Sequence, residues 1–288
     1  MLSPADLSLL GRLDIAYRRP AGGVYAGERR STRAARSPEF SDFRPYASGD
    51  DFRQIDWKAY ARLERLMLRL YVAEEEACLN LVLDTSSSME LGSPAKWPCA
   101  LRLAAALGFL GLAAMDRVQA GAWDEAGGAT PALRGVKGSG RLWTYLAGLR
   151  PGLGASATPE QLGRLRWLRP GVTVVIGDFL TEGDWAKAVS GLRRRRQEVV
   201  LWQVLGPDEE NPTLNGDLKL LDVEGDGGRE LTITPALVAL YREALEAHRA
   251  RLRSAARAGQ GRFLSSASSD GLDALMLAGL RAGVVRRG

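Results

Sequence analysis

Short apolar runs of strand length alternate with longer helical stretches through most of this chain, and no other feature restricts its fold as strongly. The first run, Cys78–Leu83, stops at Asp84. Residues 96–116 are apolar on nearly all sides, as in a helix packed against a sheet, and residues 117–123 alternate as a strand. Strands that alternate with helices form parallel sheets covered on both faces, so the sequence predicts a doubly wound α/β domain.

The alternation continues toward the C-terminus. Residues 171–176 form a β-branched run that ends just before Asp178, and a helix over 182–197 and a strand over 198–205 follow. Thr158 precedes a proline and a capping-box glutamine, which predicts a helix start. Further expected elements are a helix over 138–149, a hairpin of 218–223 with 229–233, a helix from Thr234 to near Gly259, a strand at 263–264 and a helix over 272–280.

The N-terminal part of the chain has a different character. A first helix is predicted to end near residue 19, and residues 22–49 are rich in glycine, serine and arginine without periodicity, which predicts a loop. Residues 51–63 indicate short helical turns, and residues 66–73 a strand. We therefore expect a helical or irregular extension over residues 1–77 and the α/β domain over residues 78–288.

Composition and motifs exclude several classes of protein. With 45% hydrophobic and 25% charged residues the chain is ordinary globular material. Its longest apolar run, residues 103–115, is shorter than a membrane span, so we expect a cytoplasmic protein without such a span. The only histidine, His248, has the spacing of a helix core position. Neither a nucleophile-elbow motif nor a phosphate-binding loop occurs, and we expect no enzyme.

Two acids stand at the ends of predicted strands, where ligands bind in doubly wound sheets: Asp84 and Asp178. Asp84 is followed by Ser86 and Ser88 in an Asp-x-Ser-x-Ser arrangement. A tight loop of this kind can turn one carboxylate and two hydroxyls toward one point. Hard oxygen ligands suit Mg²⁺ or Mn²⁺, so the sequence predicts a site for one such ion.

A third hydroxyl ligand is expected from Ser156 or Thr158, in the loop before the capped helix. Thr158 has a competing role as the helix N-cap, which favours Ser156. The alternative interpretation contains no metal. In it, Ser86 and Ser88 cap the following turns, and Asp84 accepts hydrogen bonds from backbone amides.

The loop resembles the metal-ion-dependent adhesion site of von Willebrand factor A domains, in which a later threonine and a later aspartate complete the site. Ala155-Ser156 stand here where that pattern has Gly-Thr. Residues 39–62, EFSDFRPYASGDDFRQIDWKAYAR, resemble the hallmark of the bacterial family called domain of unknown function 58 (DUF58). This resemblance covers about residue 30 to the end. It implies a von Willebrand factor A-like fold and a companion role for a MoxR-type AAA+ ATPase.

The hallmark segment allows two interpretations. Its charges form a paired network that pins the segment to the sheet domain, or they belong to an exposed recognition surface. The residues concerned alternate in sign around Trp57: Arg44, Arg53 and Arg62 with Asp50, Asp51 and Asp56.

These patterns together predict a non-enzymatic, cation-dependent adaptor. A cation held mainly by hydroxyls keeps positive charge and an open position, which an acidic side chain of a partner protein can fill. The alternative is nucleic-acid binding through the arginines of residues 18–36 and 193–196, although such runs are usually solvated faces. A phosphodiesterase-like metal enzyme is a remote third possibility that lacks an evident general base.

Overall fold

The computed structural model describes residues 2–16, 24–26, 39–72, 78–124, 128–152, 158–212, 216–221 and 228–288. The chain divides into two compact units. The sheet unit consists of Met1–Arg18 and Ala77–Gly288, and the hallmark unit consists of Arg19–Glu76. The expected boundary near residue 77 is present, but Met1–Arg18 belongs to the sheet unit rather than to an extension over residues 1–77.

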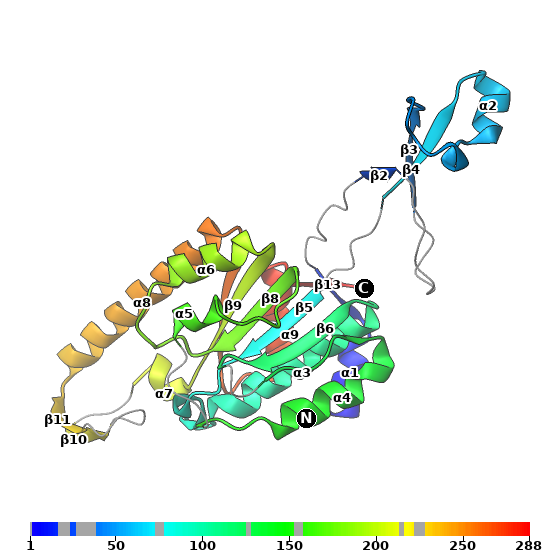
Figure 1. Ribbon diagram of the computed structural model, residues 1–288. Coiled ribbons are helices and arrows are strands. Elements are labelled where there is room, and N and C mark those ends of the chain that lie inside the picture. The colour runs from blue at the N-terminus through cyan, green and yellow to red at the C-terminus, as the bar shows by residue number, and fades with distance from the viewer. Residues whose placement is uncertain are drawn as a thin grey trace. The chain divides into compact units, whose positions relative to one another are not determined.

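The sheet unit is a mixed α/β structure around a six-stranded sheet (Figure 1). The strand order is β12-β9-β8-β5-β6-β7, and every neighbouring pair is parallel except β6 and β7. The mainly parallel sheet expected from the sequence is thus confirmed. Its strands are β5 (Cys78–Leu83), β6 (Arg117–Ala122), β7 (Leu133–Arg134), β8 (Gly171–Gly177), β9 (Gln197–Leu205) and β12 (Arg262–Ala267).

Helices cover both faces of this sheet and bury two apolar clusters. One face packs against α1 (Pro4–Leu10), α3 (Lys96–Ala113), α4 (Ser139–Gly148) and α9 (Leu272–Arg281). The other packs against α5 (Pro159–Leu162), α6 (Trp185–Arg194) and α8 (Pro235–Ala258). All six residues of β5 are buried, with Leu81 in one cluster and Val82 in the other. The central strand is therefore apolar on both sides, which explains its unbroken apolar run.

The helix α3 accounts for the long apolar stretch of the sequence. Among the described helices it alone has the length and composition to cross a membrane, and 72% of it is buried inside the sheet unit. Shorter elements follow several strands: η2 (Ser87–Glu90), η3 (Val136–Gly138), α7 (Pro207–Glu210) and the expected hairpin of β10 (Gly216–Leu221) with β11 (Gly228–Ile233).

The N-terminal segment departs from its prediction. The first helix ends at Leu10 instead of near residue 19, and β1 (Leu13–Ile15) pairs antiparallel with β13 (Val285–Arg287) at the other end of the chain. The helix α1 begins after Ser3, whose hydroxyl accepts a hydrogen bond from the backbone N–H of Asp6. Because β1 is stabilised by a partner at the opposite terminus, local periodicity carries no signal for it.

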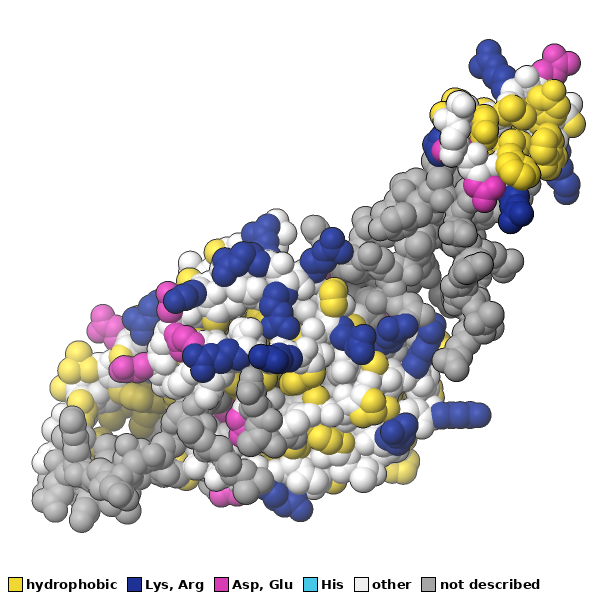
Figure 2. Space-filling view, viewed as in Figure 1, with side chains coloured by type: hydrophobic (Ala, Val, Ile, Leu, Met, Phe, Trp, Pro, Cys, Tyr) yellow, Lys and Arg dark blue, Asp and Glu magenta, His cyan; other side chains and the backbone are white. Residues whose placement is uncertain are grey.

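The hallmark unit contains a three-stranded antiparallel sheet of order β2-β4-β3. The strand expected at residues 66–73 is confirmed as β4, whereas the loop expected over residues 22–49 is wrong where β2 and β3 form. Hydrophobic side chains gather on the surface of this unit (Figure 2). Of the predicted charge network, Arg44 and Asp50 form a two-pronged ion pair with both N···O distances at 2.7 Å. The elements are β2 (Val24–Ala26), β3 (Glu39–Pro45), η1 (Phe52–Gln54), α2 (Trp57–Leu63) and β4 (Met67–Val72).

Two buried cysteines lie in the sheet unit, Cys78 on β5 and Cys99 on α3, and both are free thiols. Burial raises the pKa of each thiol to about 11. The thiolate is the reactive form, so we expect native protein at pH 8 to resist a disulfide-exchange reagent such as Ellman's reagent. After unfolding in urea, both thiols should react quickly. Fast reaction of the native protein would contradict the buried placement.

Candidate functional site

The two acids predicted at strand ends lie at neighbouring positions of the sheet edge. Asp84 follows β5, and its backbone N–H donates to the carbonyl of Ile176 on β8 at 2.9 Å. Asp178 follows β8, and both side chains are buried. Between them Gly177 leaves room for a carboxylate, since a Cβ there would lie 2.8 Å from Oδ2 of Asp84. The parallel pairing of β5 with β8 therefore brings the two acids to one edge, as predicted.

The serines of the Asp-x-Ser-x-Ser loop are close to Asp84. Its Oδ1 accepts a hydrogen bond from the backbone N–H of Ser86 at 2.9 Å. The hydroxyl oxygens of Ser86 and Ser88 are 3.0 Å apart, and the loop continues directly into η2. Ser86 is the N-cap residue of η2, but its side chain makes no capping hydrogen bond. The contact between Asp84 and the Ser86 amide is one that the metal-free interpretation expects. The hydroxyls of Ser86 and Ser88, in contrast, face each other as a pair of possible ligands would.

Loops from other strands contact the same segment. The carbonyl of Thr85 accepts a hydrogen bond from the N–H of Gly152 at 2.8 Å. The Thr85 hydroxyl donates to Oδ2 of Asp124, which follows β6, at 3.4 Å. Three chain segments therefore meet at this sheet edge, as expected for the ligand-binding end of a parallel sheet.

The predicted third hydroxyl is not placed at this loop by any described contact. Thr158 is the N-cap residue of α5 and forms a capping box with Gln161, whose side chain accepts from the Thr158 N–H at 2.8 Å. Its carbonyl accepts from the indole N–H of Trp123 at 3.0 Å. Ser156 lies outside the described residues. The helix start predicted at Thr158 is confirmed, and the third ligand stays a prediction.

A buried lysine, not singled out in the sequence, lies beside Asp178. The Lys96 side chain has 0% relative exposure, and its Nζ lies 2.8 Å from Oδ2 of Asp178 and 2.5 Å from Oε1 of Glu209. Burial alone would lower the pKa of Lys96, but the two carboxylates together raise it above its ordinary value. A cation in the first turn of an otherwise apolar helix is unfavourable toward the helix dipole, and this was the available sequence signal that Lys96 has acidic partners.

Lys96 connects three elements around the site. Oε2 of Glu209 accepts from the N–H of Gly206 at 2.7 Å, so the same carboxylate begins α7 and binds the lysine. The backbone carbonyl of Asp178 accepts from the side chain of Gln203 on β9 at 2.8 Å, and its Oδ1 accepts from the N–H of Leu180. The lysine thus holds together the start of α3 and the loops that follow β8 and β9.

The possible ligand atoms at the candidate site are oxygen atoms. Asp84, Asp178 and Glu209 carry three formal negative charges against one positive charge on Lys96. A divalent cation would reduce this excess of negative charge, and the hydroxyls of Ser86 and Ser88 are the neutral oxygen ligands it accepts. Within the described residues no group of three or more His, Cys, Asp or Glu side chains is arranged as a metal site, so the serines are essential to this assignment.

Two arginines of the cluster at residues 193–196 bind backbone carbonyl groups of neighbouring segments. Arg195 donates to the carbonyls of Gly163 and Leu165, and Arg193 donates to the carbonyl of Ala258. The six arginines between residues 18 and 36 lie outside the described residues.

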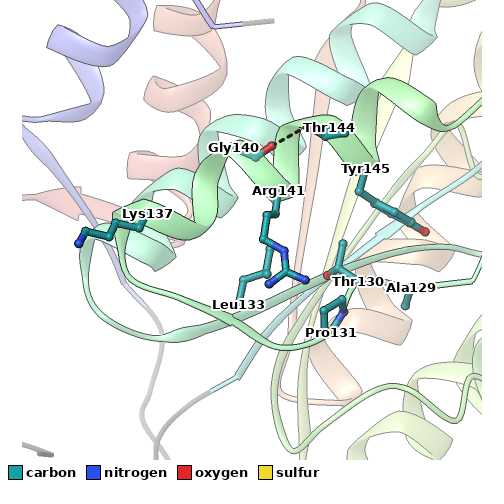
Figure 3. A pocket seen from close by; sticks show the side chains of 9 residues that line it. All are labelled: Ala129, Thr130, Pro131, Leu133, Lys137, Gly140, Arg141, Thr144 and Tyr145. Atoms are coloured by element: carbon teal, nitrogen blue, oxygen red, sulfur yellow. Dashed lines mark hydrogen bonds between the residues drawn. The ribbon is translucent and has the colours of Figure 1, made fainter.

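A separate hollow of about 590 Å³ lies beside α4 (Figure 3). The Tyr145 hydroxyl donates to the carbonyl of Gly128 at 2.8 Å, and the Thr144 hydroxyl donates to that of Gly140 at 2.9 Å. These two hydroxyl protons are thus already used within the protein. Its lining residues are Ala129, Thr130, Pro131, Leu133, Lys137, Gly140, Arg141, Thr144 and Tyr145.

A family described as "Protein of unknown function DUF58" matches residues 42–251. The chain belongs to the DUF58 family. A DUF58 relative, an uncharacterized protein of Mycobacterium tuberculosis, is 31% identical over 264 residues, which cover 86% of this chain and 80% of the relative. The matched segment begins within the hallmark unit and includes the candidate site.

Two solved structures show weaker similarity to this DUF58 protein. The conserved hypothetical protein BatB from Bacteroides thetaiotaomicron is 16% identical with a TM-score of 0.42, covering 70% of this chain and 96% of BatB. An aerotolerance-related membrane protein from Bacteroides fragilis is 18% identical with a TM-score of 0.43, covering 72% and 98% of the two chains. With such low scores, the fold description rests on the sheet topology of this chain itself.

Proposed function

We propose that this DUF58 protein is a non-enzymatic adaptor that binds one Mg²⁺ or Mn²⁺ ion and, through it, an acidic side chain of a partner protein. The sheet unit is proposed to be von Willebrand factor A-like. The observation that carries the proposal is the pair of Ser86 and Ser88 hydroxyls, 3.0 Å apart, next to the buried carboxylate of Asp84 at the end of the central strand. This set consists of the hard oxygen ligands that such ions prefer.

Each residue has a distinct role in this proposal. Asp84, Ser86 and Ser88 hold the ion, while Asp178 supplies negative charge from the neighbouring strand and remains bonded to Lys96. The ion, when bound, supplies positive charge with an open coordination position. A partner's carboxylate can fill that position, because Mg²⁺ and Mn²⁺ prefer oxygen ligands and the hydroxyls of the loop add no negative charge of their own. Ser156 or Thr158 remains the proposed third hydroxyl ligand.

The proposed partner is a MoxR-type AAA+ ATPase or one of its client proteins, and the proposed location is the cytoplasm. The ATPase partner is what the resemblance of the hallmark segment implies. The chain has no phosphate-binding loop of its own, so the hydrolysis of ATP is assigned to the partner.

Removal of Asp84 is expected to abolish stabilisation by the cation. We would titrate chelator-treated protein with Mg²⁺ and Mn²⁺, following heat by calorimetry and unfolding by thermal melting. At a hundredfold excess over its dissociation constant, a bound ion should add about 2.7 kcal/mol to the free energy of unfolding. Asp84→Ala should lose this response. Glu243→Ala, which removes an exposed acid on α8, should keep it.

Binding of a partner requires its own measurement. Wild-type protein should retain a purified MoxR-type ATPase from the same genome in Mg²⁺ and release it in chelator, and Asp84→Ala should not retain it. Saturable cation binding without an Asp84-dependent partner would limit the proposal to the metal. Absence of any response to either ion, with or without the ATPase, would contradict both cation binding and cation-dependent partner binding.

A further inference from the structure

The hallmark unit exposes large apolar side chains that the proposed cation site does not use. Figure 2 shows hydrophobic side chains gathered on this unit, with basic and acidic side chains around them. A cluster of this kind on a small folded unit marks an interaction surface more often than chance exposure. Its members, with their exposed fractions, are Phe52 (65%), Trp57 (61%), Tyr60 (43%), Leu63 (58%) and Leu66 (37%).

Three of these side chains form a stripe along α2. Trp57, Tyr60 and Leu63 are spaced three residues apart, which places neighbours on adjoining sides of one helix surface. The rings of Trp57 and Tyr60 meet edge to face with centroids 6.1 Å apart. On the opposite side Ala59 is buried against the unit. The stripe is therefore a preformed surface on a short helix whose inner side is already packed.

The start of this helix is fixed by a buried cap. Asp56 is 7% exposed, and its Oδ1 accepts hydrogen bonds from the backbone N–H groups of Lys58 and Ala59 at 2.9 and 3.2 Å. A capped helix loses less conformational freedom on binding than a mobile segment. Binding to the stripe should therefore cost little conformational entropy.

The charged residues around the stripe give this surface a net positive charge. Arg44 and Asp50 pair with each other and do not contribute. Among residues 43–68, where the structure describes the exposure of the charged side chains, the remaining exposed charges sum formally to +2, four basic against two acidic groups. Such a surface complements a partner whose apolar side chains are flanked by carboxylates. The exposed charged residues are Arg53, Lys58, Arg62 and Arg65 with Asp51 and Glu64.

We propose that the α2 stripe is a docking surface for a protein segment that presents apolar side chains flanked by Asp or Glu. Aromatic residues and arginine are the types that dominate the energetics of protein interfaces. An anionic membrane surface would be attracted by the same net positive charge, so binding to vesicles is a separate outcome of the test below. The proposal stands independently of the cation site, which lies in the other unit.

The test uses the full chain and a library of random twelve-residue peptides displayed on phage, selected in parallel on wild type and on Trp57→Ser/Tyr60→Ser. Peptides enriched only on wild type should combine aromatic or aliphatic residues with Asp or Glu. For such a synthetic peptide, the double variant should weaken binding by about thirtyfold, as for a lost hot spot. Arg62→Glu should also weaken it. Leu240→Ser, which removes a 62% exposed leucine of α8, should have no effect.

Three results would overturn the proposal. Equal enrichment on wild type and the double variant would show that the stripe does not select peptides. Enriched sequences without acids would remove the assigned partner chemistry. Sedimentation of the full chain with phosphatidylglycerol vesicles, lost in the double variant and without peptide selection, would identify a membrane-binding face instead.

Discussion

Lys96→Met is expected to lower the free energy of unfolding by about 3–5 kcal/mol, the usual cost of removing one partner from a buried ion pair. Methionine keeps most of the apolar stem of the lysine, so the loss arises from charge rather than from volume. Without the ammonium group, Oδ2 of Asp178 and Oε1 of Glu209 lose the cation that lies 2.8 and 2.5 Å away. Asp178 is 1% exposed, so water cannot replace the lost contact.

Urea unfolding of chelator-treated protein measures this effect without any contribution from a metal. Lys187→Met, at an exposed position of α6, is the matched control and should change stability by less than about 0.5 kcal/mol. The double variant Lys96→Met/Asp178→Asn should recover part of the loss, because the buried negative charge is removed as well. A single variant as stable as wild type would show that the buried pair is absent in solution.

The dependence on pH has a definite sign. The pKa of Lys96 is raised in the folded protein, above its ordinary value of 10.5. Its stabilising contribution is therefore fully present at neutral pH and is lost only as the pH rises through the raised value. The difference between wild type and Lys96→Met should accordingly stay constant from pH 7 to about pH 9.

The sequence predicted the elements whose signal is local. Cys78–Leu83 was expected as a strand and is β5, and the long helix expected after Thr234 is α8, Pro235–Ala258. Asp84 and Asp178 were expected at adjoining strand ends because parallel strands end at the same edge, and the pairing of β5 with β8 places them there. An apolar run that ends at a polar residue predicts both the strand and its end, and it does so without any knowledge of the rest of the chain.

Contacts between distant parts of the chain were not predictable in this way. The Lys96 partners lie 82 and 113 residues away, and nothing near Lys96 in sequence identifies them. The sequence predicts a loop where β2 and β3 lie, because β2 has only three residues and the pairing of β3 with β4 shifts register between Phe40 and Asp42. A short strand and an interrupted alternation leave too little periodicity to be recognised.

Gly177→Ala is expected to disturb the candidate cation site directly. The new Cβ would lie 2.7 Å from Cβ and 2.8 Å from Oδ2 of Asp84, closer than such atoms approach, so one of them must move. The Asp84 backbone is held by its hydrogen bond to Ile176, and its Oδ1 is held by the N–H of Ser86. The overpacking should cost about 1–3 kcal/mol of unfolding free energy. Displacement of Asp84 should weaken Mg²⁺ binding by about 10- to 100-fold.

Calorimetric titration with Mg²⁺ and urea unfolding in chelator separate the two effects. Gly140→Ala is the matched control: its Cβ meets nothing within 4 Å, and it lies in the helix α4. Alanine there should be neutral or add up to about 1 kcal/mol of stability, with unchanged Mg²⁺ affinity. If Gly177→Ala loses stability but keeps the Mg²⁺ affinity of wild type, the close contact with Asp84 is real and Asp84 is not a ligand. If it loses neither, the approach of the two strand ends is itself wrong, because a methyl group would then fit between them.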